Sequence, residues 1–152
     1  KQGIHIINEK QVNAAQRKQI SEYFEKVVET NLVPIMIRSK NKFPQLLDKR
    51  IYLAVKLWKE EDKSSIKYAL IEIPTSVISR FYVLEAKDGE RYVILLDDII
   101  RMHLRKLFHI FEYDHIRAYT FKFTRDAELD VEDDLNLSTL ESLTGTAELR
   151  IH

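Results

Sequence analysis

The sequence predicts an α+β domain in which a mixed, largely antiparallel sheet packs against two or three helices. Three observations lead to this prediction: one segment with the apolar spacing of a helix, several segments that alternate with a period of two, and turn-rich stretches between them. The 152 residues, 45% of them apolar, are enough to form one core. We therefore expect a single domain over residues 1–152.

The first half of the chain predicts one helix and one hairpin. Residues 13–29 carry apolar side chains three and four positions apart, and Pro34 follows, so an amphipathic helix should end before that proline. A short strand or an extended docking segment is expected around His5. Residues 50–59 and 66–73 both alternate, which is typical of a pair of antiparallel strands.

The second half predicts another hairpin, a helix and a strand. Residues 80–85 and 91–96 flank a loop that contains Gly89, which favours a hairpin. A helix should then begin at Asp97 and Asp98, whose carboxylates can cap free amides. Its buried stripe is predicted to contain Ile100, Leu104, Leu107, Phe108 and Phe111. Residues 115–124 alternate again, and a short helical pattern follows with Leu137, Leu140 and Leu143.

Composition excludes several classes of function. The 24 basic and 24 acidic side chains balance, so no overall field attracts the chain to nucleic acid, and DNA is not an expected partner. Cysteine is absent, which excludes disulfides, thiolate metal sites and cysteine nucleophiles. No apolar run is long enough to span a bilayer, and no leader is recognisable. We expect a segment of a longer cytoplasmic protein, with peripheral attachment to a membrane as an alternative.

Three cations form the candidate binding residues. Arg101 and Arg105 are one helical turn apart, Lys106 is adjacent, and His109 would extend the row if the helix continued that far. Such a stripe could hold the oxygens of a polyanion. The alternative, which we favour, is a solvated face paired with nearby carboxylates, namely Asp97, Asp98 and Glu112.

Other candidate residues have simpler explanations. None of the five histidines lies in a known catalytic or metal-binding motif, and a structural role is expected for His103. Six carboxylates between residues 126 and 134 could bind Mg²⁺, but capping of a strand end is the favoured interpretation. Trp58 could lie at a protein interface, although a core or edge position is favoured. We assign no catalytic, cofactor-binding or metal-binding residue.

Six short stretches, in order, resemble the middle or head domain of bacterial polyphosphate kinase, which transfers the γ-phosphoryl group of ATP to polyphosphate. They are Gly3-Ile4, Val33-Pro34-Ile35 with Phe43-Pro44-Gln45-Leu46, Ile51–Val55, Ile73-Pro74 with Ser79-Arg80-Phe81, Leu95–Phe108, and Phe121–Leu129. The resemblance extends to about Leu143. Residues 144–152 depart from the family pattern and form an atypical or truncated tail.

The resemblance implies a non-catalytic domain that supports the architecture and dimerisation of its parent. Family members are several times longer, and their phosphorylated histidine and most residues for ATP and magnesium lie in C-terminal domains outside this chain. ATP and Mg²⁺ are thus implied for the parent, with no cofactor in this chain, which should be inactive alone. The expected partners are the remaining domains and a second subunit, with polyphosphate as a candidate. The alternative is a self-standing module that binds polyphosphate or single-stranded nucleic acid.

Overall fold

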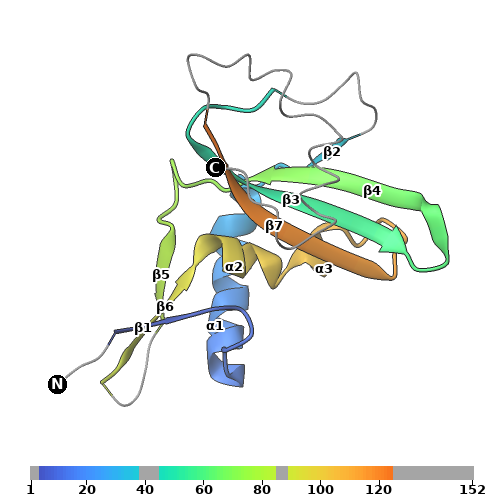
Figure 1. Ribbon diagram of the computed structural model, residues 1–152. Helices are drawn as coiled ribbons and strands as arrows, with labels where there is room; N and C mark the ends of the chain where they lie inside the picture. The colour runs from blue at the N-terminus through green and yellow to red at the C-terminus, as the bar shows by residue number, and fades with distance from the viewer. Residues whose placement is uncertain (1–3, 38–44, 85–88, 125–152) are drawn as a thin grey trace. The chain divides into compact units, whose positions relative to one another are not determined.

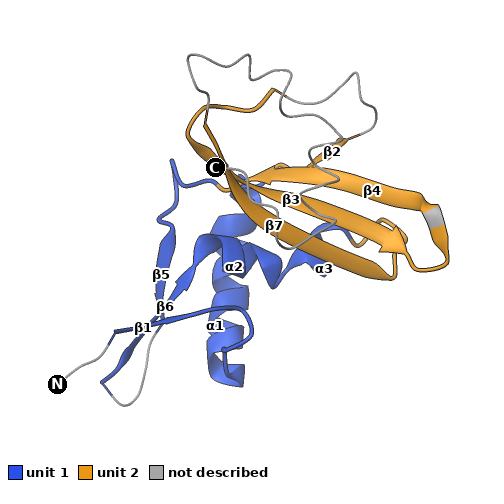
Figure 2. Ribbon diagram, in the orientation of Figure 1, with its two compact units in different colours: residues 1–32, 74–108 blue, residues 33–73, 109–152 orange. Residues whose placement is uncertain are grey.

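The computed structural model describes residues 4–37, 45–84 and 89–124 (Figure 1). The chain divides into two compact units, shown in Figure 2. Unit 1 consists of residues 1–32 and 74–108, and unit 2 of residues 33–73 and 109–152.

Unit 1 contains a three-stranded sheet with the order β1-β6-β5. The edge strand β1 (Ile4–Ile7) pairs in parallel with the central strand β6 (Arg91–Leu95), and β5 (Phe81–Leu84) pairs with β6 in the antiparallel direction. The hairpin predicted around Gly89 is confirmed, and this glycine has a φ of 79°, a backbone conformation that favours glycine.

The first predicted helix is confirmed. Helix α1 (Ala14–Tyr23) continues through a π-helical turn, Phe24–Val28, and a short 3₁₀ turn, Glu29–Asn31. Its start is fixed by Asn13, whose Oδ1 accepts the Gln16 N–H at 2.8 Å, while the Asn13 N–H donates to Gln16 Oε1 at 3.0 Å. This reciprocal pair satisfies amide groups that a helix start leaves open.

The second predicted helix is shorter than expected. It is interrupted after α2 (Leu96–Arg101), and a separate helix α3 (Leu104–Leu107) follows. The residue before the first turn of α2 is Leu95, and no side chain caps it, so the predicted capping by Asp97 and Asp98 is wrong. Both carboxylates instead contact Arg101, which lies three and four residues further along.

Unit 2 contains a four-stranded antiparallel sheet with the order β2-β4-β3-β7. Its strands are β2 (Ile35–Ile37), β3 (Arg50–Lys59), β4 (Asp62–Glu72) and β7 (His115–Phe123). The sequence had indicated β3, β4 and β7 but not the three-residue β2. Leu46, Tyr52, Ala54, Leu70, Phe121 and Phe123 form a buried cluster in this unit.

The α+β class is confirmed, but the strands form two sheets rather than the single sheet that was expected. Strand β4 ends at Glu72, and Pro74, which has no amide hydrogen, begins a turn that ends the pairing. The second hairpin then pairs with β1 instead of with the first hairpin. The acidic stretch 126–134, the helical pattern of Leu137, Leu140 and Leu143, and the tail 144–152 lie outside the described residues.

Candidate functional site

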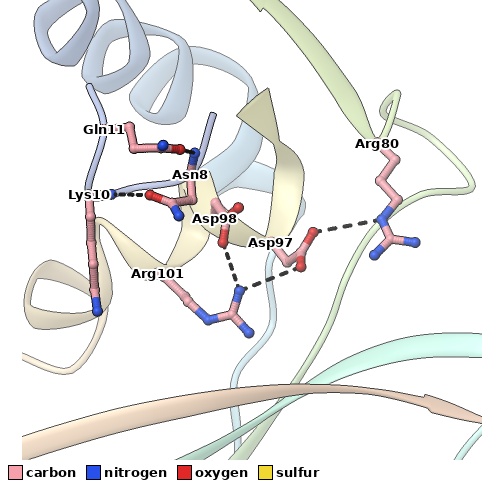
Figure 3. A network of polar contacts seen from close by, with 7 residues as sticks. All are labelled: Asn8, Lys10, Gln11, Arg80, Asp97, Asp98 and Arg101. Atoms are coloured by element: carbon pink, nitrogen blue, oxygen red, sulfur yellow. Dashed lines mark hydrogen bonds and ion pairs between the residues drawn. The ribbon is translucent and has the colours of Figure 1, made fainter. Parts of the chain in front are cut away.

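The most concentrated set of charged side chains in the described part of unit 1 is Arg80, Asp97, Asp98 and Arg101, here called the charged cluster (Figure 3). Arg101 Nη1 lies 2.9 Å from Asp98 Oδ1 and 3.5 Å from Asp97 Oδ2. Arg80 Nε lies 3.7 Å from Asp97 Oδ1, an ion pair longer than a hydrogen bond. Asp97 therefore joins the two arginines, and Asp98 adds a second carboxylate to Arg101.

Local structure brings these four residues together. Asp97 and Asp98 lie in the first turn of α2 and Arg101 ends it, so the helical spacing places the guanidinium beside both carboxylates. Arg80 precedes β5, and its carbonyl oxygen accepts the Leu96 N–H at 2.7 Å. This backbone contact holds the start of β5 against the start of α2.

The carboxylates of the cluster are poorly solvated. The Asp97 side chain is 6% exposed and that of Asp98 13%. Burial raises the pKa of Asp98 to about 6, and the nearby Glu9 and Asp97 act in the same direction, whereas Arg101 opposes the shift. The cluster can therefore hold or release one proton near pH 6, and its cations are already matched by carboxylates.

His103 lies between α2 and α3 in a second polar site. Its Nδ1 lies 2.7 Å from the Ile99 carbonyl oxygen, and its Nε2 lies 3.2 Å from Ser21 Oγ. Because a carbonyl oxygen only accepts, Nδ1 must carry the proton and Nε2 must accept the Ser21 hydroxyl. The ring also stacks on Phe24, with centroids 4.0 Å apart, and burial lowers the His103 pKa. These contacts support the structural role that was expected.

Two of the three candidate cations are paired with carboxylates, and the break between α2 and α3 separates Arg101 from Arg105 and Lys106. Arg101 belongs to the charged cluster, and Lys106 Nζ lies 2.9 Å from Glu25 Oε1 and 3.6 Å from Glu29 Oε1. Helix α3 ends at Leu107, so His109 is not part of a helix, which corrects the conditional extension of the stripe. Binding of a polyanion by Arg101, Arg105 and Lys106 stays a prediction.

Trp58 lies in unit 2 near the end of β3, directly opposite His115 in β7. The two rings stack with centroids 5.1 Å apart, and Lys56 Nζ lies 5.1 Å from the tryptophan ring centroid. The side chain is half-buried. Its role at an interface stays a prediction as well.

The described residues contain no group of three or more histidine or carboxylate side chains placed to hold a metal ion. The acidic stretch considered for Mg²⁺ lies outside them. Within the same described ranges, no helix is both long and apolar enough to cross a membrane.

The sequence favoured pairing of the cationic stripe with Asp97 and Asp98, but it did not predict the contact between Asp97 and Arg80. One signal was present. Arg101 follows the two aspartates at helical spacing, and Arg80 and the aspartates come from two of the stretches that resemble the family. What the sequence could not show is that the turn after β4 returns Arg80 to the start of α2.

Comparisons with known proteins connect this structure to one family. The family model described as "Polyphosphate kinase middle domain" matches residues 15–150. The chain is 39% identical to a polyphosphate kinase of Vibrio parahaemolyticus serotype O3:K6 and 35% identical to one of Escherichia coli K12, in each case over 97% of its length. The crystal structure of polyphosphate kinase from Porphyromonas gingivalis has the same fold, with a TM-score of 0.75 over 98% of this chain at 24% identity.

The match covers only part of each relative. The chain spans 21% of the Vibrio protein, 22% of the Escherichia coli protein and 25% of the Porphyromonas gingivalis chain. The matched part is the one that the family model describes as the middle domain. The chain therefore belongs to the polyphosphate kinase family and corresponds to its middle domain.

Proposed function

We propose that this chain is an architectural, non-catalytic part of an enzyme that transfers the γ-phosphoryl group of ATP to polyphosphate, and that it supports dimerisation of that enzyme. The observation that carries the proposal is the match to the middle domain over nearly the whole chain. In this proposal ATP and Mg²⁺ bind to the parts of the enzyme that lie outside the chain.

The contacts of the candidate cations support a structural role over polyanion binding. Arg101 is held by two carboxylates and Lys106 by two others. A phosphate group at Arg101 would have to displace Asp97 and Asp98 and leave these poorly solvated carboxylates without their cation, which costs free energy. The Lys106 pairs are exposed, so they oppose phosphate binding less. The charged cluster is then best understood as a connection that keeps α2 beside β5.

The end of the β3–β7 pair is our candidate for the dimer contact. Trp58 is half-buried there, and Ile110, in the loop that leads to β7, is 74% exposed. The loop is held to β3, since the Asp114 N–H donates to the Trp58 carbonyl oxygen at 2.9 Å and Lys59 Nζ lies 3.1 Å from Glu112 Oε2. In a dimer contact at this end, Trp58 and Ile110 would supply the apolar side chains, and the held loop would lose little conformational freedom on binding.

Sedimentation equilibrium of the full-length enzyme tests this function. Trp58→Ala and Ile110→Glu should each raise the dissociation constant of the dimer by about tenfold or more, since a central interface side chain contributes more than 1 kcal/mol. The matched control is Val33→Glu, because Val33 is also 74% exposed in unit 2 but lies before β2. If the dissociation constant is unchanged in both Trp58→Ala and Ile110→Glu, this surface is not the dimer contact. If the native enzyme is a monomer, the proposed dimerisation role is wrong.

A further inference from the structure

The three-stranded sheet of unit 1 has one covered face and one open face. Residues paired across strands point to the same side, so the register places Ile6, Val93 and Val83 in one row and Leu95 beside Phe81. We call this side the open face. It carries six apolar residues, Ile4, Ile6, Phe81, Val83, Val93 and Leu95, and the exposed Arg91 lies at its edge opposite Ile4.

The opposite face is covered by the helix of the same unit. This opposite face of the sheet contains Leu84 and Ile94, which are 1% and 0% exposed. Tyr82, on that face, stacks on Tyr23 of α1 with ring centroids 4.0 Å apart, and its hydroxyl accepts a hydrogen bond from Gln19 Nε2 at 3.2 Å. On β5 and β6, this side of the sheet therefore already has its packing layer.

The open face is apolar but exposed. Ile4 and Ile6 are each 68% exposed, Phe81 is 56% exposed and Val83 57%. Ile4 and Ile6 lie on one edge strand and Phe81 and Val83 on the other, with Val93 and Leu95 of β6 between them, so apolar side chains of all three strands contribute to this face.

The strand sequences show that this face is built for burial. A sheet with one side in water alternates apolar and polar residues, whereas β5 reads Phe-Tyr-Val-Leu and the core of β6 reads Tyr-Val-Ile-Leu. This pattern indicates a second layer.

The size of the face determines what can cover it. Three strands of about four residues span an area on the order of 200 Å² from the standard strand spacing and rise. A stable interface between two proteins needs about 800 Å² on each side, so this face alone is too small to hold two subunits together. Its width of three strands is close to the diameter of one helix, about 10 Å.

We propose that an amphipathic helix from the same polypeptide, in the part of the polyphosphate kinase outside residues 1–152, packs on this open face. The relatives are about five times longer than the chain, so most of the polypeptide is available for the contact. A segment of the same polypeptide also binds at a high effective concentration, which allows a small contact to be stable. The proposal rests on membership of the family and does not depend on the dimerisation role.

Photo-crosslinking in the full-length enzyme tests this directly. The photoreactive residue p-benzoylphenylalanine replaces Phe81, which is already aromatic and exposed, and replaces Val77 in the control, which is 69% exposed and lies in the turn before β5. After irradiation, mass spectrometry identifies the attached peptides. We expect a cross-link from position 81 to a peptide outside residues 1–152 of the same subunit, and none from position 77.

Three results would overturn the proposal: a cross-link to a second subunit, a cross-link to a peptide within residues 1–152, or no cross-link at all. If dimerisation is lost in the Ile110→Glu enzyme, the cross-link from position 81 should persist in the monomer, which separates this inference from the proposed function.

A second test uses a smaller substitution, Val83→Cys, in case the variant with the photoreactive residue at position 81 does not fold. In full-length Val83→Cys enzyme, the thiol at position 83 should react with maleimide at least about tenfold more slowly than the thiol in the Val77→Cys enzyme, because reaction requires the covering layer to open. Rates in the denatured enzymes provide the reference, and peptide mass spectrometry distinguishes other cysteines. Equal native rates would refute the covering layer.

Discussion

Replacement of Asp98 by asparagine tests the physical description of the charged cluster. Asparagine retains an oxygen that can accept the hydrogen bond from Arg101 Nη1, which lies 2.9 Å from Asp98 Oδ1. The substitution removes only the negative charge and the proton that it binds. The substitution therefore measures the free-energy cost of burying the charged carboxylate while the hydrogen-bond acceptor stays in place.

The pKa of Asp98 determines the sign of the effect. This pKa rises from 3.8 to about 6 on folding, so the folded chain binds the proton more tightly than the unfolded chain. The resulting stabilisation is complete below pH 3.8 and is lost as the pH rises through 6. A shift of about two pKa units corresponds to about 3 kcal/mol at pH 7.

Asp98→Asn should therefore be about as stable as the native chain at pH 4 and more stable at pH 7, by about 1 to 3 kcal/mol. Urea unfolding at a series of pH values, followed by circular dichroism, measures the difference in free energy between the two chains. A difference that does not change with pH, or an asparagine variant that is less stable at pH 7, would refute this reasoning.

Asp62→Asn is the matched control, for which the expected change in stability at neutral pH has the opposite sign. Asp62 is exposed, and hydrogen bonds from the Ser64 hydroxyl and amide lower its pKa. Its charged form is therefore favoured by folding, and Asp62→Asn should be less stable than the native chain at neutral pH, with the difference disappearing in acid. The same urea series provides this measurement.

Three further predictions concern unit 1. Phe24→Ala should lower the free energy of unfolding by about 3 to 5 kcal/mol, because Phe24 is fully buried. Val27→Ala, on the exposed side of the same helix, should change the free energy of unfolding by less than about 1 kcal/mol. Similar urea midpoints for the two variants would contradict the assigned helix face. Asn13→Ala should cost about 1 kcal/mol through loss of the helix cap, and an unchanged thermal melt would contradict that role. Burial lowers the His103 pKa, so the midpoint of the His103 titration followed by NMR should lie below 6.5. The stability that the neutral His103 ring contributes should be lost as the pH falls below that value. A midpoint above 6.5 would contradict the burial of the neutral ring.

Local pattern was sufficient to predict the elements whose signals lie in a few adjacent residues. The apolar spacing from Ile20 to Val28 and the following Pro34 predicted the first helix, whereas its cap at Asn13 is a finding of the structure. The alternation in residues 50–59 identified β3, although both of its faces are buried, with Tyr52 and Ala54 as well as Leu53 and Val55.

Pairing over long distances in the sequence was not predictable in the same way. Nothing near Ile4 shows that β1 pairs with a strand almost ninety residues later, so the sequence analysis expected one sheet where there are two. The break between α2 and α3 was also missed, since apolar spacing continues across it. There the Ile99 carbonyl oxygen is engaged by the His103 ring, a contact that periodicity does not reveal.

The long-range contact in the charged cluster was also not predictable from local sequence pattern. The helical spacing of Asp97, Asp98 and Arg101 was visible, but the contact with Arg80 depends on how the chain returns after Pro74.

The central claim is that this chain is the non-catalytic middle domain of a polyphosphate kinase, and phosphoryl transfer measures it most directly. The purified chain, shown to be folded by a cooperative thermal melt, is incubated with ATP labelled in the γ-phosphoryl group, Mg²⁺ and polyphosphate, beside the full-length enzyme. The account predicts labelled polyphosphate with the full-length enzyme, and neither labelled polyphosphate nor labelled protein with the chain alone. Label on the chain, at His103 or any other residue, or growth of polyphosphate would contradict it.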